Sequence, residues 1–314
     1  MKKAIMFSGQ GSQKFGMGKD LYDKSPQSRK VFENANDIIG ERFSDKIFST
    51  TEDQLTDPRI NQLAIFIYEM AIFLGQDEIQ PDFVAGHSLG EYAALVAAGV
   101  LSMEDTISFL KIRGEVLYDA FVKNPSAMGV VIGISDEEVK KIISDISDEN
   151  SHIYIANYNG PGQLVITGQM EVIKNACKIF RGMGAKRSFL LPQKGFGHSP
   201  NSIQEGKILA KELQKLKWNE PHIPIFQDVD GEKHTDQNEI LENQIKLLTH
   251  PVLWTSIINN MAKEGVTEFY ECGTDDTLQK IVSRMYPDFN VDTLWNTTRF
   301  KGIEPYILNI QNSH

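Results

Sequence analysis

A serine between two glycines is the first feature of this sequence that could carry out chemistry. Residues 86–90 read Gly-His-Ser-Leu-Gly and match the pattern G-x-S-x-G. An apolar run before them predicts a strand and residues 91–98 predict a helix, which is the context that this motif needs. Flanking glycines let the chain turn tightly enough to expose the hydroxyl, and the helix N-terminus directs N–H groups at a developing negative charge. Ser88 is therefore the candidate nucleophile, with a plain turn and a helix-capping serine as the alternative.

A serine nucleophile needs a base, and the chain offers seven histidines. His87 is adjacent to Ser88, but neighbouring side chains on a sharp turn diverge, so it is a poor base for that hydroxyl. His198 follows a glycine-rich segment at the point where a predicted inserted subdomain returns to the larger one. We therefore expect His198 at a cleft and choose it as the candidate general base, with a surface-loop histidine as the alternative.

An arginine interrupts the apolar stripe of the helix predicted over residues 103–121. The stripe consists of Met103, Ile107, Leu110, Leu117 and Phe121. Arg113 lies on the same face, where a leucine would be expected. A guanidinium in an apolar setting is costly unless it finds an anion, so Arg113 is a candidate anion-binding residue. A structural ion pair with a carboxylate of the protein is the alternative.

The elements that must position these residues divide into two groups. Residues 3–7 predict a strand that enters a glycine-rich turn, and a mostly helical stretch follows to about residue 79. Between residues 127 and 192 the predicted order is βαββαβ, the ferredoxin-like arrangement. Strands of the first type resume at residues 223–229 and 268–272. Two subdomains of this kind would face each other across a cleft.

Composition excludes several classes of function. The formal net charge of −10 argues against a nucleic-acid partner. Residues 93–101, the longest run of small apolar residues, are far short of the roughly 20 that a membrane span needs. The start MKKAIMF shows no cleavage motif, and two distant cysteines fit a reducing compartment, so we expect a cytoplasmic protein. No cluster with metal-ligand spacing is visible, and residues 9–12 lack the lysine and spacing of a phosphate-binding loop.

Seven segments together resemble one known family. They are residues 7–13, 86–92, 113–114, 157–163, 184–187, 198–200 and 251–254. Their order and spacing are those of malonyl-CoA:acyl carrier protein transacylases, and the likeness covers about residues 3–285. Several motifs in register are far more specific than G-x-S-x-G alone.

The resemblance implies a ping-pong acyl transfer. Ser88, with His198 as general base, would attack the thioester of an acyl-CoA, and the backbone N–H groups of Gln10 and Leu89 would bind the oxyanion. The phosphopantetheine thiol of an acyl carrier protein would then take the acyl group from the serine. In this family a backbone carbonyl orients the histidine, which here points to residues 247–250, so no acidic third residue is expected.

The resemblance also implies roles for charged residues around the cleft. Arg113 would bind the free carboxylate of a malonyl group with two hydrogen bonds, which favours a transferase over a hydrolase of neutral acyl chains. An acidic carrier protein would be repelled by the net charge at long range, so docking would need a local basic patch. Lys186 and Arg187, together with Lys194, are the candidates, and a merely solvated pair is the alternative.

This sequence departs from the family at several positions. Ser8 replaces the usual proline of the first motif, and Gly197 stands where phenylalanine or serine usually precedes the histidine. Asn201 and Ser202 lie where a larger apolar residue is common. We expect an acyl pocket bounded by Gly197 and Leu117 that is roomier than usual and admits alpha-substituted malonyl groups.

We therefore predict an α/β protein with an α/β-hydrolase-like catalytic subdomain at residues 1–126 and 193–314 and an inserted ferredoxin-like subdomain at residues 127–192. It would be a monomeric acyltransferase of fatty acid or polyketide synthesis, with no bound cofactor and with acyl-CoA and acyl carrier protein as partners. The alternatives are a serine acyl hydrolase acting on carrier proteins and an inactive docking module. Arg113 counts against the first, and the joint presence of Ser88, His198 and Gln10 counts against the second.

Overall fold

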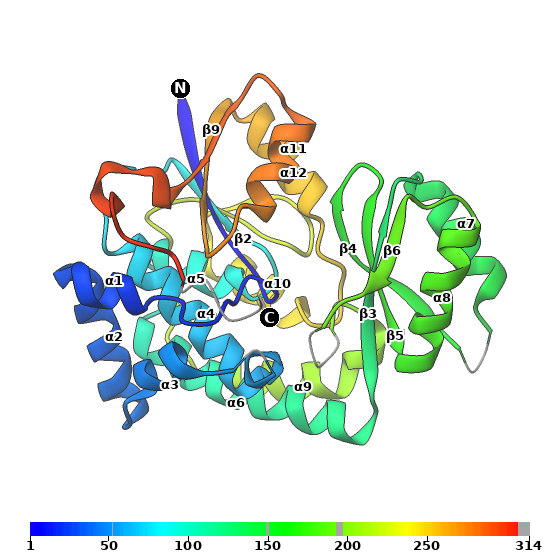
Figure 1. The fold of residues 1–314 in the computed structure, drawn as a ribbon, viewed down its shortest axis with the longest axis horizontal. Helices are drawn as coiled ribbons and strands as arrows, with labels where there is room; N and C mark the ends of the chain where they lie inside the picture. The colour runs from blue at the N-terminus through cyan, green and yellow to red at the C-terminus, as the bar shows by residue number, and fades with distance from the viewer. Residues whose placement is uncertain (52, 149–150, 193–196, 307–314) are drawn as a thin grey trace, which may run out of the picture.

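A computed structural model describes residues 1–51, 53–148, 151–192 and 197–306 of the chain. Its strands form two separate sheets, each covered by its own helices (Figure 1). The larger sheet has the strand order β10-β9-β1-β2-β7-β8, and the smaller one has the order β4-β5-β3-β6. No helix within these described ranges is long and apolar enough to cross a lipid bilayer.

The larger sheet is parallel except at one edge, where β8 runs antiparallel to β7. Its strands are β1 (Lys2–Phe7), β2 (Phe83–Gly86), β7 (Ile225–Phe226), β8 (Lys233–His234), β9 (Val266–Cys272) and β10 (Asn290–Thr293). The central strand β1 reads as a continuous apolar run because it is covered on both faces. Phe7 pairs with Gly86, so the segments that follow β1 and β2 leave the sheet side by side.

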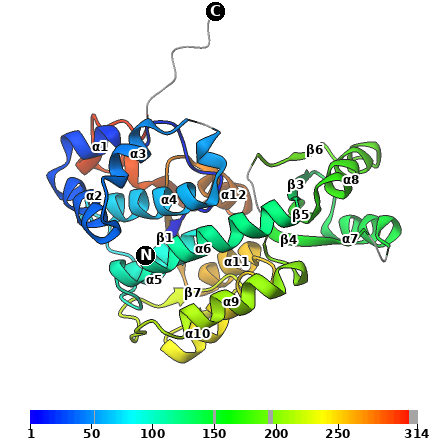
Figure 2. The ribbon, with the colours of Figure 1, turned by 90° about the horizontal axis from the view of Figure 1, so that it is seen from below.

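Helices cover both faces of the larger sheet (Figures 1 and 2). Ile5 and Phe7 of β1 pack in the core with the helices before α7, whereas Ala4 and Met6 pack with α11 and α12. The helices are α1 (Lys19–Lys24), α2 (Pro26–Ile39), α3 (Phe43–Ser49), α4 (Pro58–Phe73), α5 (Gly90–Ala97), α6 (Met103–Lys123), α9 (Ile203–Leu213), α10 (Gln237–Lys246), α11 (Trp254–Lys263) and α12 (Thr277–Met285). This arrangement confirms the predicted α/β class.

The smaller sheet is antiparallel and its elements follow the predicted order βαββαβ. They are β3 (Ser126–Ile132), α7 (Asp136–Ile146), β4 (Ile153–Gly160), β5 (Gln163–Gln169), α8 (Met170–Gly182) and β6 (Arg187–Leu190). Both helices pack on one face of this sheet. The other face carries a small apolar cluster that includes Val130 and Val165. The ferredoxin-like prediction is therefore confirmed.

The two subdomains are connected at more than one place. Helix α6 runs from beneath the larger sheet to the smaller one, where β3 begins (Figure 2). The edge strand β4 also contacts Val252 of the larger subdomain. Tyr158 N donates to Val252 O at 2.9 Å, and Val252 N donates to Ala156 O at 2.8 Å. The segment just before α11 is thus joined to the smaller sheet.

Some predicted elements differ from those observed. The strand expected over residues 223–229 contains only the two residues of β7, because the polar residues after Phe226 turn away into buried contacts. The described part of the helical stretch expected to residue 79 contains four α-helices and one short 3-10 helix at Gln54–Thr56. Pro26 and Pro58 each begin a helix, and Gly40 ends one in the left-handed conformation at φ 82°. Strand β10 was not predicted, since its half-exposed residues lack an apolar pattern.

Candidate active site

Ser88 lies in a sharp turn between β2 and α5. Its φ of 55° is in the left-handed region, where a non-glycine residue costs about 1–3 kcal/mol. A Cβ on Gly86 would lie 2.0 Å from the carbonyl group of Gly90, and a Cβ on Gly90 would lie 2.4 Å from Phe7 O. Both glycines are therefore required by close backbone approach, and the turn presents the serine at the carboxyl end of the parallel strands.

His198 contacts the serine directly. Its Nε2 is 2.6 Å from Ser88 Oγ, and its Nδ1 is 2.9 Å from Leu247 O and 3.2 Å from His250 O. Carbonyl oxygens only accept hydrogen bonds, so Nδ1 carries the proton and Nε2 accepts from the serine hydroxyl. Both carbonyls lie in the range 247–250 where the resemblance placed the orienting group. His198 is itself held in the left-handed region, with a φ of 59°.

The surroundings of His198 keep the imidazole neutral. Burial lowers the pKa of His198 and, together with the positive charge of Arg113 and the neighbouring His87, brings it to about 3. At neutral pH the ring is therefore free to accept a proton. His87 does not compete for the serine, because its Nε2 lies 2.8 Å from Asn159 Oδ1 and its ring packs on Trp254.

The backbone amides of Gln10 and Leu89 are the predicted oxyanion-binding groups, and Gln10 lines the cavity that contains Ser88. The Ser88 amide is not one of them, since it donates to Asp228 Oδ2 at 2.6 Å. Among the described residues, no acceptor receives a hydrogen bond from the amides of Gln10 or Leu89. Gln10 follows β1 and Leu89 follows the serine. The pairing of β1 with β2 brings their two segments together.

Arg113 is buried, with 4% of its surface exposed, and it lines the same cavity as Ser88 and His198. Its Nη1 donates to Gln62 Oε1 at 2.6 Å, and its guanidinium lies 5.5 Å from the centre of the Tyr92 ring. No carboxylate in the described part of the chain forms an ion pair with it. The structural ion pair considered as an alternative is thus not what the described structure contains.

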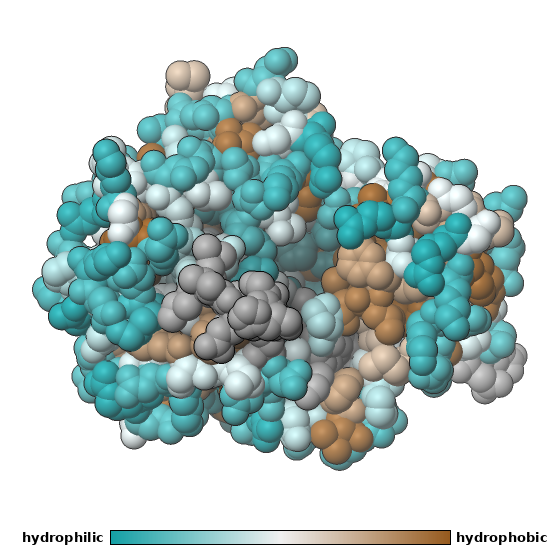
Figure 3. Space-filling view, viewed as in Figure 1, coloured by the Kyte–Doolittle hydropathy of each residue, from teal (hydrophilic) through white to brown (hydrophobic). Residues whose placement is uncertain are grey.

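A cavity of about 290 Å³ joins these groups. The larger subdomain contributes Ser88, His198 and Arg113, and the smaller one contributes Met128 and Val130. Figure 3 shows a hollow between the two subdomains, bordered on the smaller one by hydrophobic surface. Within the described ranges, no group of three His, Cys, Asp or Glu residues could hold a metal ion.

The two predicted pocket residues both line this cavity. Leu117 is buried on α6, one helical turn beyond Arg113, and Gly197 is buried beside His198. A Cβ on Gly197 would lie 3.1 Å from Leu248 Cδ1, which is tighter than most real contacts. A larger residue at position 197 would therefore press first on Leu248, which is itself a wall of the cavity.

The predicted docking residues lie away from the cavity wall. Lys186 and Arg187 are exposed at and just before the start of β6. Arg187 pairs with Ile132, so it lies on the face of the smaller sheet that also carries Val130, and its guanidinium lies 5.2 Å from the Phe189 ring centre. Lys194 lies outside the described residues.

Sequence reasoning missed two residues of the site, Gln62 and Asp228. Asp228 could have been found, because it is a polar residue at the end of an apolar strand, where parallel strands gather functional side chains. Gln62 gave no such signal. It lies on the almost wholly buried helix α4, and only the fold brings it to Arg113.

Comparison with known proteins agrees with this geometry. Residues 5–294 match the acyl transferase domain family. The chain is 34% identical to the malonyl CoA-acyl carrier protein transacylase of Bacillus subtilis (strain 168), over 90% of each chain. It is also similar to the acyl-carrier-protein S-malonyltransferase structure from Bartonella henselae, with 32% identity, a TM-score of 0.89 and coverage of 96% of this chain and 98% of that one.

A further similar structure is a malonyl-transacylase in complex with the holo form of a type II polyketide synthase acyl carrier protein. It is 27% identical, with a TM-score of 0.90, and covers 96% of this chain and 98% of that one. With a family model that spans nearly the whole chain and an elbow serine, an imidazole and an arginine in one cavity, this protein belongs to the acyl transferase domain family.

Proposed function

We propose that this protein transfers a malonyl group from CoA to the phosphopantetheine thiol of an acyl carrier protein. The observation that supports this most directly is the single cavity with a serine bonded to a neutral imidazole and a buried arginine without a carboxylate partner among the described residues. The names of the relatives in B. subtilis and B. henselae describe the same reaction.

In the first half-reaction, His198 Nε2 takes the hydroxyl proton as Ser88 Oγ attacks the thioester carbonyl. The amides of Gln10 and Leu89 bind the negative charge that develops on the carbonyl oxygen. The carbon–sulfur bond then breaks, and the imidazolium returns the proton to the CoA sulfur. In the second half-reaction His198 takes the proton of the carrier thiol, the sulfur attacks the acyl-serine, and Ser88 regains its proton.

Arg113 supplies the reason to prefer a dicarboxylic acyl group. A guanidinium offers two parallel N–H groups to a carboxylate, and in a buried setting this interaction outweighs a neutral contact. The same pair of hydrogen bonds would hold the acyl group in position for attack by a thiol. The hydrolase alternative, which acts on neutral acyl chains, leaves the charge of Arg113 unexplained.

We extend this proposal to the acyl pocket, the docking residues, the compartment, the oligomeric state, the pathway and the cofactor. Gly197 and Leu117 bound an acyl pocket that admits alpha-substituted malonyl groups, and Lys186 and Arg187 contribute to carrier docking. The protein acts as a cytoplasmic monomer in fatty acid or polyketide synthesis, with no bound cofactor. The free, buried cysteines fit a reducing compartment. A panel of malonyl-, methylmalonyl- and ethylmalonyl-CoA tests the pocket, and light scattering tests the monomer.

The central experiment follows the acyl group by intact-protein mass spectrometry. Incubation with malonyl-CoA should give a malonyl adduct, and added holo acyl carrier protein should remove it with a matching gain in carrier mass. Ser88→Ala should form no adduct. An adduct that is lost to water at the same rate without carrier would support the hydrolase instead, and an adduct on Ser88→Ala would refute the assigned nucleophile.

A further inference from the structure

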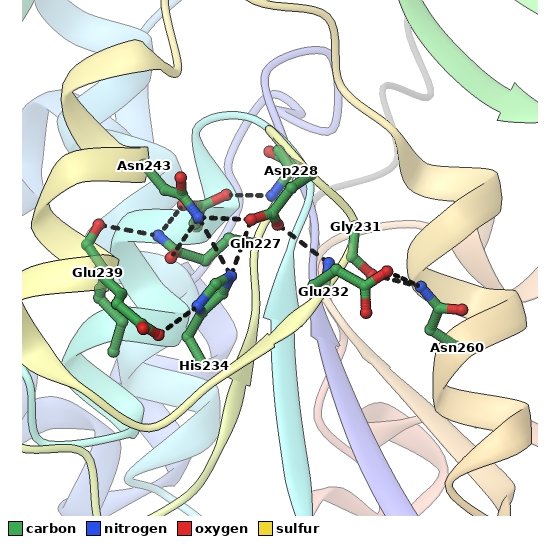
Figure 4. Close-up of polar contacts among 11 residues, drawn as sticks. Gln227, Asp228, Gly231, Glu232, His234, Glu239, Asn243 and Asn260 are labelled. Atoms are coloured by element: carbon green, nitrogen blue, oxygen red, sulfur yellow. Dashed lines mark hydrogen bonds and ion pairs between the residues drawn. The ribbon is translucent and has the colours of Figure 1, made fainter.

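A cluster of polar side chains lies directly behind the serine turn, buried at its inner end and exposed at Glu239. Figure 4 shows it extending from Asp228 and Gln227 through Asn243 to His234 and Glu239. The inner members of the cluster, Glu91, Gln227 and Asp228, are 0% exposed. Groups of this kind are costly to bury, so each requires an explanation.

We propose that Asp228, supported by Glu91, is a positioning residue that holds the peptide N–H of the nucleophile in place. The Ser88 amide donates to Asp228 Oδ2 at 2.6 Å. The Asp228 amide donates in turn to Glu91 Oε2 at 2.9 Å, and Gln227 Nε2 donates to Glu91 Oε1 at 3.0 Å. The proposal rests on the role of Ser88 in the proposed function.

These hydrogen bonds connect three segments of the chain whose relative placement determines the position of Ser88. Ser88 is in the turn after β2, Glu91 is in the first turn of α5, and Asp228 follows β7. The hydrogen bond from Ser88 gives its buried amide an acceptor and favours the left-handed φ of that residue. It also turns this amide away from the cavity and leaves the next one, on Leu89, for the oxyanion.

The protonation of Asp228 and Glu91 is compatible with a role beside the serine. Burial raises the pKa of Asp228 well above its usual range, and the charge of Glu91 raises it further. Burial likewise raises the pKa of Glu91 to about 7, with Asp230 as a nearby negative charge. Asp228 Oδ1 has no hydrogen-bond partner in the described structure. A proton held by the pair would let Oδ2 accept from Ser88 without placing a full negative charge beside a developing oxyanion.

Three substitutions at Asp228 separate positioning from packing. Asp228→Asn keeps an oxygen that can accept from Ser88 and adds an amide that can donate to Glu91. Asp228→Leu has a similar size and no acceptor. Asp228→Glu keeps the carboxyl but moves it by one methylene, and it replaces the leucine variant if that one does not fold. Asp230→Asn is the matched control, because Asp230 contacts Asn243 and His234 but not the serine turn.

Two reactions at Ser88 provide the readout. One is the single-turnover rate of acylation by malonyl-CoA, and the other is the rate of labelling by a fluorophosphonate, which reacts with activated serines whatever acyl group the enzyme uses. Asp228→Leu should slow both by about tenfold to a hundredfold and leave the half-saturating malonyl-CoA concentration within about twofold. Asp228→Asn and Asp230→Asn should stay within about threefold of wild type.

The results distinguish this inference from the proposed function. Wild-type rates of both reactions in Asp228→Leu, or in Asp228→Glu if it is used, would overturn the positioning role. Equal slowing in Asp228→Asn and Asp228→Leu would also overturn it, since acceptance of the amide would then not matter. If malonyl-CoA gave no adduct while fluorophosphonate labelling still followed the Asp228 series, the proposed function would fail and the positioning role would stand.

Discussion

At the scale of single residues, we expect Arg113 to determine which acyl groups the cavity favours. Replacing it by alanine removes a buried, charge-assisted contact, so kcat/KM for malonyl-CoA should fall by about a hundredfold. The value for acetyl-CoA, which has no free carboxylate, should change little. Steady-state kinetics with both thioesters measures the ratio.

Arg59→Ala is the matched control for this prediction, because Arg59 pairs with Asp57 and does not line the cavity. Its ratio of malonyl to acetyl transfer should equal that of the wild type. An unchanged ratio in Arg113→Ala would show that the carboxylate is bound elsewhere.

The lowered pKa of His198 predicts an unusual pH dependence for the reactivity of Ser88. With its pKa lowered to about 3, the imidazole stays a neutral base at pH 5, where an ordinary histidine would be only about 3% neutral. The rate of fluorophosphonate labelling should therefore remain near its plateau down to pH 5. Arg113→Gln removes a positive charge that lowers this pKa, so the loss of rate on acidification should begin at a higher pH. A midpoint near 6.5 in the wild type would contradict the neutral, buried state.

The sequence indicated the residues that meet in this cavity better than the residues that support them. Ser88 and His198 carry local signals, a glycine-flanked turn and a glycine-rich segment between subdomains, and Arg113 breaks an apolar stripe. Asp228 and Gln62 hold these residues through contacts between distant segments. The contact of Gln62 exists only once the fold is formed, so no spacing in the sequence records it. Asp228 carries a weaker signal, that of a polar residue at the end of an apolar strand.

At the scale of elements, the turn between β2 and α5 requires glycine, which has no side chain, at positions 86 and 90. Gly90→Ala would place a Cβ 2.4 Å from both Phe7 O and Ser8 O. Because these are backbone atoms of the central strand segment, they cannot yield cheaply, and we expect a loss of about 3 kcal/mol or more in the free energy of unfolding. Urea denaturation measures it.

Gly182→Ala serves as the comparison, since a Cβ at Gly182 meets nothing within 4 Å. It lies at the end of α8 and should be neutral or slightly stabilising. Similar stability of the two alanine variants would mean that the close approach at the turn is not rigid.

Elements with strong patterns were predictable, whereas β10 was missed and the length of β7 was overestimated. Helix α7 takes its place in the predicted βαββαβ order, and a capping box between Ser135 and Glu138 fixes its start. Strand β10 and the two-residue β7 are defined by their partners in the sheet rather than by their own residues. The subdomain boundaries at residues 126/127 and 192/193 remain a prediction.

At the scale of the whole molecule, buried carboxyls make stability depend on pH. Glu271 is 0% exposed, accepts from Ser8 Oγ at 2.9 Å, and has its pKa raised to about 8 by burial and by Asp275. A raised pKa means that the folded state keeps a proton that the unfolded state releases above about pH 4.5. Its stabilising effect is thus complete below that pH and is lost as the pH rises through 8.

The expected result is a free energy of unfolding that decreases between pH 5 and pH 8, with a smaller decrease in Glu271→Gln. Chemical denaturation across this range measures the slope. Glu242→Gln, at an exposed position, should leave the slope as in the wild type. An unaltered slope in Glu271→Gln would assign the effect to other groups, such as Glu91 or Glu69, whose pKa values burial also raises.

The hydrogen bonds between β4 and Val252 link the smaller sheet to the backbone that orients His198. The carbonyls that orient His198 belong to Leu247 and His250, and Val252 follows them after a single proline. A displacement of the smaller sheet that moved Val252 would also move this short stretch of backbone. The orientation of the His198 imidazole would then change with it. These hydrogen bonds therefore tie the position of the smaller sheet to the backbone that orients the general base proposed for the reaction.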